Sequence, residues 1–164
     1  GDVVLSGFFS SIGLDDRHRA DLQAEQVDRA AEVMSLLGLQ ALAKRKYHTL
    51  STGQQRRCLL GRALVHEPQT LIFDEPTSGL DMTASFDLLA QVSELVKRGC
   101  NLLWVTHHLN DIPREIERVI ILKDGAIVAD GAKAQVLQPE LLREVYETEL
   151  RLVEVDGHFL AYPP

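Results

Sequence analysis

Two acidic residues that follow an apolar run are the residues of this sequence best suited to chemistry. The run is Leu-Ile-Phe at 71–73, and Asp74 and Glu75 come directly after it. Such a run predicts a buried strand, and because side chains alternate along a strand, the two carboxylates cannot point the same way. In phosphate chemistry the first acid would hold Mg²⁺ through its water shell, and the second would orient or deprotonate an attacking water. Acids also end many strands as solvated caps, and for the pair taken alone this alternative stays open.

A hydroxyl residue and a glycine lie upstream, at the predicted start of a helix. Residues 50–55 read Leu-Ser-Thr-Gly-Gln-Gln, and Ser51 with Gln54 fits a capping box, which satisfies free N–H groups at a helix start. The same N–H groups and the Ser51 hydroxyl can bind phosphate oxygens. A well-capped helix without a ligand is the competing interpretation, and the segment in isolation favours it.

A histidine follows the next apolar run. Residues 104–108 read Trp-Val-Thr-His-His, which places His107 just beyond a predicted strand. A lone histidine there is usually a hydrogen-bonded structural residue. As a partner to a terminal phosphate, it would instead sense whether nucleotide is present.

Alternating helices and strands must position these residues. Apolar residues at helical spacing predict helices over 21–37, 51–66 and 82–98, the last with Phe86 facing inward. Buried strands are predicted over 70–73, 101–106 and 118–122. Asp-Gly pairs at 124–125 and 156–157 predict two hairpins, of which the second joins 151–155 to 158–162. The segment 3–14, which is apolar but broken by Gly and Ser, predicts a loop or a short helical piece. This alternation is typical of a parallel α/β sheet.

Length and composition limit the function classes. The chain has 164 residues, of which 45% are hydrophobic, so most of it is expected to fold around a core. Its 24 acidic and 17 basic residues give a net charge of −7, which argues against nucleic acid as the main partner because that affinity needs clustered cations. Cys58 and Cys100 form no C-x-x-C pair, and reduced thiols in a cytosolic protein are the default for such cysteines.

In combination, these segments resemble the ATP-binding cassette (ABC) ATPase family. Residues 50–54 resemble its signature motif, with Thr52 where glycine is commonest, and residues 71–75 resemble the Walker B strand. Residues 78–81, Ser-Gly-Leu-Asp, are similar to the D-loop, with glycine for the more usual alanine. His107 falls on the switch histidine, and His108 replaces the aspartate that often follows it. Four linked motifs in this order are highly specific, and the resemblance extends from residue 1 to about residue 140.

The resemblance implies a role for each matching residue. Asp74 would associate with the metal, Glu75 would be catalytic and polarise the water, and His107 would be catalytic and hold the γ-phosphate. The nucleotide-binding residues would be Ser51, Thr52, Gly53, Gln54 and Asp81. The implied substrate is ATP, with Mg²⁺ as cofactor. The implied partners are a second ABC ATPase subunit in a head-to-tail dimer and a membrane permease, with no nucleic acid.

The fold class that the resemblance implies is α/β. It is an incomplete P-loop NTPase with an ABC-type, RecA-like parallel sheet, a helical subdomain and C-terminal β-hairpins. Residues 1–49 would be part of the helical (signature) subdomain, 50–140 the C-terminal half of the ATPase core, and 141–164 an appendage with a hairpin. The protein would be cytoplasmic and peripheral on the inner face of the cell membrane, where a permease holds it.

The phosphate-binding P-loop motif, G-x-x-x-x-G-K-[ST], does not occur in these 164 residues, and none of the lysines follows a glycine. In the family, the P-loop and a Gln-bearing loop both precede the signature motif. We therefore expect the C-terminal part of an ABC ATPase that drives transport, inactive when isolated; a degenerate protein without a P-loop is the alternative. A soluble cytosolic ABC ATPase without a permease, and a non-catalytic interaction module, also stay open.

Overall fold

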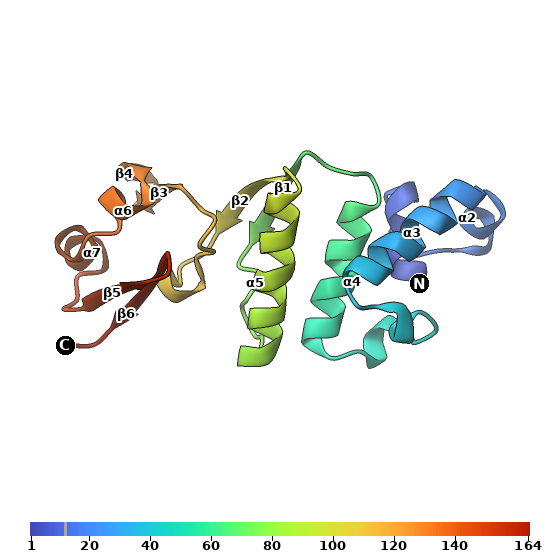
Figure 1. Cartoon of the computed structure of the whole chain (residues 1–164), viewed down its shortest axis with the longest axis horizontal. Coiled ribbons are helices and arrows are strands. Elements are labelled where there is room, and N and C mark those ends of the chain that lie inside the picture. Colours follow the sequence, from blue (N-terminus) through green and yellow to red (C-terminus); the bar gives the residue numbers. More distant parts are fainter. Residues whose placement is uncertain (12) are drawn as a thin grey trace. The chain divides into compact units, whose positions relative to one another are not determined.

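The structure, a computed structural model, describes residues 1–11 and 13–164 (Figure 1). The elements up to Leu64 are all helical, and strands and helices follow from Thr70 onward. The α-helices are α1 (Asp2–Leu5), α2 (Asp16–Ala20), α3 (Ala24–Leu36), α4 (Thr52–Leu64), α5 (Met82–Lys97), α6 (Lys133–Val136) and α7 (Pro139–Tyr146). Short 3₁₀ helices are η1 (Ser6–Phe9), η2 (Gln40–Leu42), η3 (Tyr47–Thr49) and η4 (Leu109–Asp111). The strands are β1 (Thr70–Asp74), β2 (Asn101–Val105), β3 (Arg118–Lys123), β4 (Ala126–Ala132), β5 (Arg151–Val155) and β6 (His158–Tyr162).

These residues form two compact units. The first comprises Gly1–Leu71 and Pro76–Leu103, and the second comprises Ile72–Glu75 and Trp104–Pro164. The first unit therefore contains the segment that resembles the signature motif, whereas the second contains Glu75 and His107. The division into 1–49, 50–140 and 141–164 stays a prediction.

Helices α1, α3 and α4 pack together in the first unit. Val4 of α1, Val33 of α3 and Leu60 of α4 are buried there. Gly61 lies where the three helices meet, because a Cβ at that position would lie 3.2 Å from side-chain atoms of both Val4 and Leu37. The helices thus approach closely around a residue that has no side chain.

The N-terminal helices differ from the sequence prediction in their starts. Helix α3 begins later than predicted because Gln23 and Gln26 form a capping box, in which the Gln23 N–H donates to Gln26 Oε1 at 3.0 Å. It ends as predicted before Gly38, whose φ is +64°. The segment 3–14 is helical at its start, in α1 and η1, and position 12 lies outside the described residues.

Strands β1 and β2 pair in parallel. The Asn101 N–H donates to the Gln69 carbonyl at 2.8 Å, and at the other end the Glu75 N–H donates to the Val105 carbonyl at 2.9 Å. The prediction that the β1 run is buried on both faces is wrong, since Leu71 is buried while Ile72 is 69% exposed. Only one face of β1 is covered by the described residues, whereas a continuous apolar run is typical of a strand covered on both.

Helix α5 follows its predicted bounds, but its inward face differs. The buried positions are Leu88, Val92 and Leu95, whereas Phe86 is 62% exposed. At about 100° per residue, Phe86 lies on the side of the helix opposite Leu88. The prediction that Phe86 faces the core is therefore wrong, because the apolar residues of α5 occupy both faces.

The two predicted hairpins are confirmed. β3 pairs with β4 and β5 with β6, both antiparallel, and the bounds of β5 and β6 match the prediction. Asp124, Gly125, Asp156 and Gly157 all have positive φ, which is the backbone that a two-residue type I′ turn requires. Leu137, Leu142, Leu150 and Phe159 are buried in the core between these hairpins and α7.

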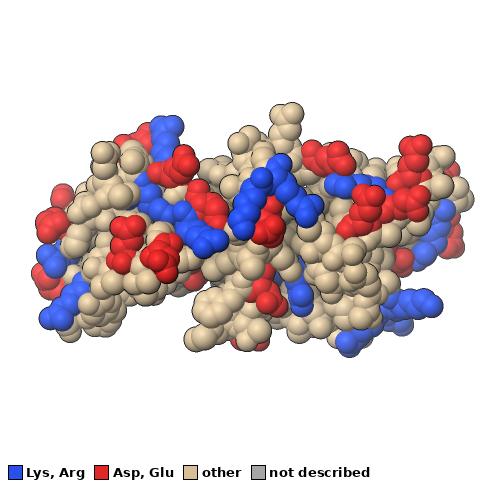
Figure 2. Space-filling view, in the orientation of Figure 1, with Lys and Arg blue, Asp and Glu red and all other residues tan. Residues whose placement is uncertain are grey.

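On the face shown in Figure 2, basic side chains are interspersed with acidic ones rather than gathered in one basic patch. None of the helices formed by the described residues has the length and apolar character that a membrane crossing needs.

Candidate active site

The end of β1 presents Asp74 and Glu75 differently. Asp74 is the last residue of the strand, and Glu75 has a left-handed backbone with φ of 44°. A non-glycine residue in this region is uncommon and costs energy, about 1–3 kcal/mol. The turn takes the Glu75 side chain out of the alternation of the strand, while the Glu75 N–H still donates to Val105 of β2.

Glu75 and His107 contact each other. The His107 Nδ1–H donates to Glu75 Oε1 at 2.7 Å, although the residues are 32 positions apart in sequence. The side chains are 44% and 59% exposed, respectively, so both are accessible to a ligand. Because Nδ1 uses its proton in this bond, Nε2 can donate to an anion only from the doubly protonated imidazolium.

Asp74 is available to a cation. It is exposed, and its carboxylate makes no hydrogen bond or ion pair within residues 1–11 and 13–164. Carboxylate oxygens are hard ligands, and Mg²⁺ usually keeps several waters while it is held by one or two carboxylates and substrate phosphates. The side chain therefore fits a magnesium ion held through water.

The segment that resembles the signature motif starts α4. Ser51 Oγ accepts from the Gln54 N–H at 3.3 Å, and Gln54 Oε1 accepts from the Ser51 N–H at 3.1 Å. The predicted capping box is thereby confirmed. Thr52 is the first residue of the helix and is exposed. The Ser51 hydroxyl and the Gln54 side-chain amide thus already have a structural role in capping the start of the helix.

The start of α5 lies against the start of α4. Asp81 caps α5 by accepting from the Ala84 N–H at 2.8 Å. A Cβ added at Gly53 would lie only 2.7 Å from the Ala84 Cβ, so glycine is required for this contact. The structure therefore brings the predicted nucleotide-binding residues together at two neighbouring helix N-termini, which are favourable places for anions.

The predicted site residues thus form two groups. Ser51, Thr52, Gly53, Gln54 and Asp81 lie at the starts of α4 and α5 in the first unit, and Asp74, Glu75 and His107 lie at the ends of β1 and β2 in the second. Their catalytic, nucleotide-binding and metal-binding roles stay predictions.

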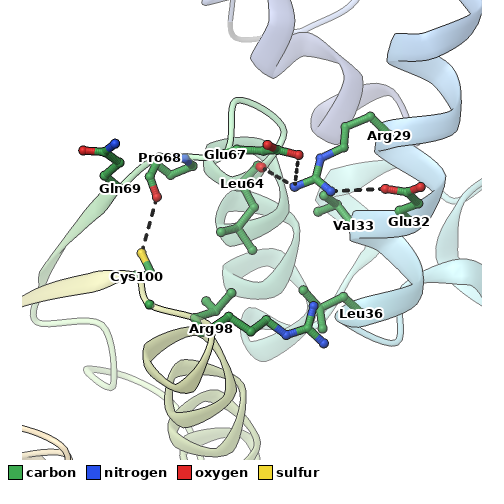
Figure 3. Close-up of a pocket in the computed structure, with 12 residues that line it drawn as sticks. Arg29, Glu32, Val33, Leu36, Leu64, Glu67, Pro68, Gln69, Arg98 and Cys100 are labelled. Atoms are coloured by element: carbon green, nitrogen blue, oxygen red, sulfur yellow. Dashed lines mark hydrogen bonds and ion pairs between the residues drawn. The ribbon is translucent and has the colours of Figure 1, made fainter.

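A cavity of about 550 Å³ lies apart from these residues, between α3, the end of α4 and the end of α5. Among its charged lining residues, Arg29 is paired, as Figure 3 shows. The guanidinium contacts Glu32 at 3.1 Å, Glu67 at 3.3 Å and the Leu64 carbonyl at 3.4 Å. No sequence motif indicated this cavity, and its Arg29–Glu67 ion pair joins α3 to the loop after α4.

Sequence reasoning missed two residues that contact the segment carrying His107. The Tyr146 hydroxyl lies 3.5 Å from the His107 carbonyl oxygen, and Asn110 Oδ1 accepts from the Ala161 N–H at 2.8 Å. Both contacts join residues far apart in the chain, so local spacing carries no signal for them.

Comparisons with known proteins show which family the chain belongs to. The family pattern described as ABC transporter matches residues 5–78. An ABC transporter ATP-binding protein from Streptococcus mutans serotype c is 31% identical over 156 residues, which cover 94% of this chain and 58% of that protein. The hemin import ATP-binding protein HmuV from Rhodopseudomonas palustris is 35% identical over 88% of this chain and 55% of its own length. The chain belongs to the ABC ATPase family.

Solved ABC ATPase structures share the fold. MJ1267, the ATP-binding cassette of an ABC transporter, in its ADP conformation superposes with a TM-score of 0.74 at 25% identity, covering 90% of this chain and 63% of that one. A metal-chelate type ABC transporter in an inward-facing conformation gives a TM-score of 0.81 at 22% identity, covering 98% and 63%. The α/β fold of a partial P-loop NTPase is thereby confirmed. The chain spans 58% and 55% of the length of the two curated relatives named above.

Proposed function

We propose that this ABC ATPase chain supplies part of the machinery that hydrolyses ATP to drive transport across a membrane. The observation that carries the proposal is the 2.7 Å contact between Glu75 Oε1 and His107 Nδ1. It joins an acid and a histidine that follow two paired strands, at the carboxyl edge where open α/β sheets bind ligands. The family membership supports the choice of ATP as the substrate.

The residues at this edge divide the work between them. Glu75 orients and polarises a water for in-line attack on the γ-phosphorus, and His107 holds the γ-phosphate through Nε2. The Nδ1 contact with Glu75 fixes the ring for that task. Asp74 would hold Mg²⁺ through its water shell, and the ion would supply positive charge that neutralises the phosphates.

The residues at the starts of α4 and α5 contact the nucleotide that is bound to a second subunit. Ser51, Thr52, Gly53 and Gln54 approach the ATP of a second ABC ATPase subunit in a head-to-tail dimer, and Asp81 lies beside them. The helix N-terminus favours the negative phosphates. A membrane permease is the second partner and places the protein on the cytoplasmic face of the membrane. The relative from Rhodopseudomonas is named for hemin import, and we assign no cargo to this chain.

The 164 residues alone are proposed to be inactive. They contain no G-x-x-x-x-G-K-[ST] motif, so the backbone N–H groups and lysine that cradle the phosphates of ATP must come from residues outside them. A soluble ABC ATPase without a permease, and a non-catalytic interaction module, are the competing functions that the following experiment separates.

The decisive variant is Glu75→Gln, made in the full-length product of the gene that encodes this chain. We expect kcat for ATP hydrolysis to fall by on the order of 100-fold or more, because the water loses its base, while ATP-driven dimerisation persists. Glu25→Gln, an exposed glutamate of α3, is the matched control and should leave kcat unchanged. Turnover of Glu75→Gln at the wild-type rate would contradict the assignment.

The competing functions give different results with the wild-type protein. ATP hydrolysis that rises when the purified permease is added in lipid vesicles supports transport. Hydrolysis that no permease changes supports a soluble ATPase. The absence of hydrolysis in the wild-type protein supports an interaction module and overturns the proposal.

A further inference from the structure

The apolar side chains of the segment that follows His107 pack against residues near the C-terminal end of the chain. Ile112, just after η4, is 9% exposed and belongs to one buried cluster with Leu142 of α7 and Phe159 of β6, and Leu109 of η4 packs against that cluster. Leu142 is fully buried. Burial of such side chains stabilises by about 1.5–3 kcal/mol each. The position of η4 therefore depends on α7 and β6.

Two polar contacts add to this packing. Asn110 Oδ1 of η4 accepts from the Ala161 N–H of β6 at 2.8 Å. This hydrogen bond joins η4 to the hairpin. The Tyr146 hydroxyl, at the end of α7, donates to the His107 carbonyl at 3.5 Å, which is a long hydrogen bond. Burial raises the pKa of Tyr146, so this hydroxyl keeps the proton that it donates.

A buried lysine joins the loop after η4 to the same hairpin. Lys133 is 8% exposed, and its Nζ donates to the carbonyl oxygens of Arg114 at 2.9 Å, Gly157 at 3.0 Å and Pro113 at 3.3 Å. A buried ammonium is tolerated when its donors are satisfied in this way. The loop 112–116 is thus held to the β5–β6 turn by a single side chain.

Within the loop itself, the described contacts that hold His107 are local. The Thr106 Oγ1 accepts from the His108 N–H at 3.0 Å, and the rings of His107 and His108 lie 3.8 Å apart at their centroids. These contacts shape the turn but do not anchor it to another element. Besides the hydrogen bond from His107 to Glu75, the anchors come from α7 and β6.

We propose that α7 and the β5–β6 hairpin, residues 139–162, act as a positioning module for His107. They hold η4 and keep His107 Nδ1 within hydrogen-bond distance of Glu75 Oε1. Asn110 and Tyr146 are the positioning residues. The catalytic consequence rests on the proposed function, whereas the mechanical link is a property of the chain itself.

The first test measures the mechanical link in the 164-residue chain. The imidazole resonances of His107 are assigned by NMR as those lost in His107→Gln. We expect Asn110→Ala to move these resonances by more than their line width, because the acceptor for Ala161 is gone. Asn110→Asp keeps an acceptor oxygen and should restore the wild-type positions. Asn101→Ala, an exposed asparagine at the start of β2, is the control for the same substitution elsewhere.

A second variant covers the case in which Asn110→Ala does not fold. Tyr146→Phe removes one oxygen only, and Tyr162→Phe is its control because both tyrosines are 44% exposed. We expect Tyr146→Phe, and not Tyr162→Phe, to move the His107 resonances. His107 resonances that stay in place in both Asn110→Ala and Tyr146→Phe would overturn the proposal.

The second test measures the catalytic consequence in the full-length protein. We expect Asn110→Ala to lower kcat for ATP hydrolysis by about tenfold with the KM for ATP within about twofold, since small misplacements of a catalytic group are costly, and Asn110→Asp to recover it. A wild-type protein that never hydrolyses ATP would refute the proposed function but leave the NMR result standing. Unchanged kcat in Asn110→Ala, with active wild-type protein, would refute the positioning role alone.

Discussion

At the scale of single residues, Glu75 combines an uncommon backbone with a contact to His107. Its φ of 44° places it in the left-handed region, which non-glycine residues occupy at a cost of about 1–3 kcal/mol. Such strain persists where the surroundings determine it, and here the Glu75 N–H bonds β2 while the side chain meets His107. The strained residue is thus the one for which we propose the catalytic role.

We expect replacement of Gly53 by alanine to destabilise the protein, although helix propensity alone favours alanine. Alanine is usually the better residue inside a helix, by about 1 kcal/mol. We expect Gly53→Ala to lower the free energy of unfolding by about 1–3 kcal/mol instead, because the new Cβ would lie 2.7 Å from the Ala84 Cβ. Urea unfolding followed by circular dichroism measures the change. The double variant Gly53→Ala with Ala84→Gly should recover part of the loss, and a stabilised single variant would contradict the close contact.

The sequence predicts the members of the candidate site but not their supports. Asp74, Glu75 and His107 stand out because each follows an apolar run, and the ends of parallel strands meet at one edge. The Ser51 capping box is likewise local. Asn110 and Tyr146 could not be found in this way, since their contacts join positions 51 and 39 residues apart.

At the scale of elements, the sequence predicts where the hairpin turns lie, but it does not predict which side of a helix or strand is buried. The Asp156-Gly157 pair fixes the bounds of β5 and β6 because few residues adopt two successive positive φ angles. The inward face of α5 could not be assigned, since Phe86 and Leu88 are both apolar and only the neighbouring elements decide which is buried. The same holds for the exposed side of β1.

The β3–β4 hairpin gives a pH-dependent prediction. Arg118 donates two hydrogen bonds to Asp130, at 2.8 and 2.7 Å, and these lower the pKa of the Asp130 carboxyl. Because the carboxyl has a lower pKa in the folded state, its ionisation stabilises the folded protein at pH values above the ordinary aspartate pKa. This stabilisation is lost as the pH falls through the folded-state pKa. We expect Asp130→Asn to be less stable than wild type near neutral pH, with the difference vanishing in acid.

Urea unfolding at a series of pH values between about 2 and 7 measures this difference. This pH range spans the ordinary aspartate pKa. Asp87→Asn, an exposed aspartate of α5, is the matched control for the loss of one negative charge. A difference between wild type and Asp130→Asn that stays constant across the series would contradict the role of the ion pair.

At the scale of the whole molecule, apolar side chains remain exposed on several elements. Met82 is 73% exposed, Ile72 69%, Leu122 69% and Phe86 62%. Exposed apolar strands and faces mark sites of association with other protein.

We therefore expect the isolated chain to self-associate in solution. Light scattering coupled to size exclusion should give a mass above that of the monomer, 18.3 kDa, that rises with concentration. Ile72→Lys places a charge on the exposed side of β1 and should shift the population toward monomer. Thr148→Lys adds the same charge at an exposed polar position and should not. A monomer at all concentrations would refute this expectation.

The buried ammonium of Lys133 has a consequence for chemical labelling. Amine-acylating reagents attack a neutral, accessible Nζ, and this one is enclosed by three carbonyl oxygens and lies 5.7 Å from the centre of the Phe159 ring. Lys44, Lys46 and Lys97 are exposed and react without any opening of the fold. Mass spectrometry compares the rate at which Lys133 is acylated with the rates of these internal standards. The rate at Lys133 therefore reports how often the β5–β6 turn separates transiently from the loop beyond η4.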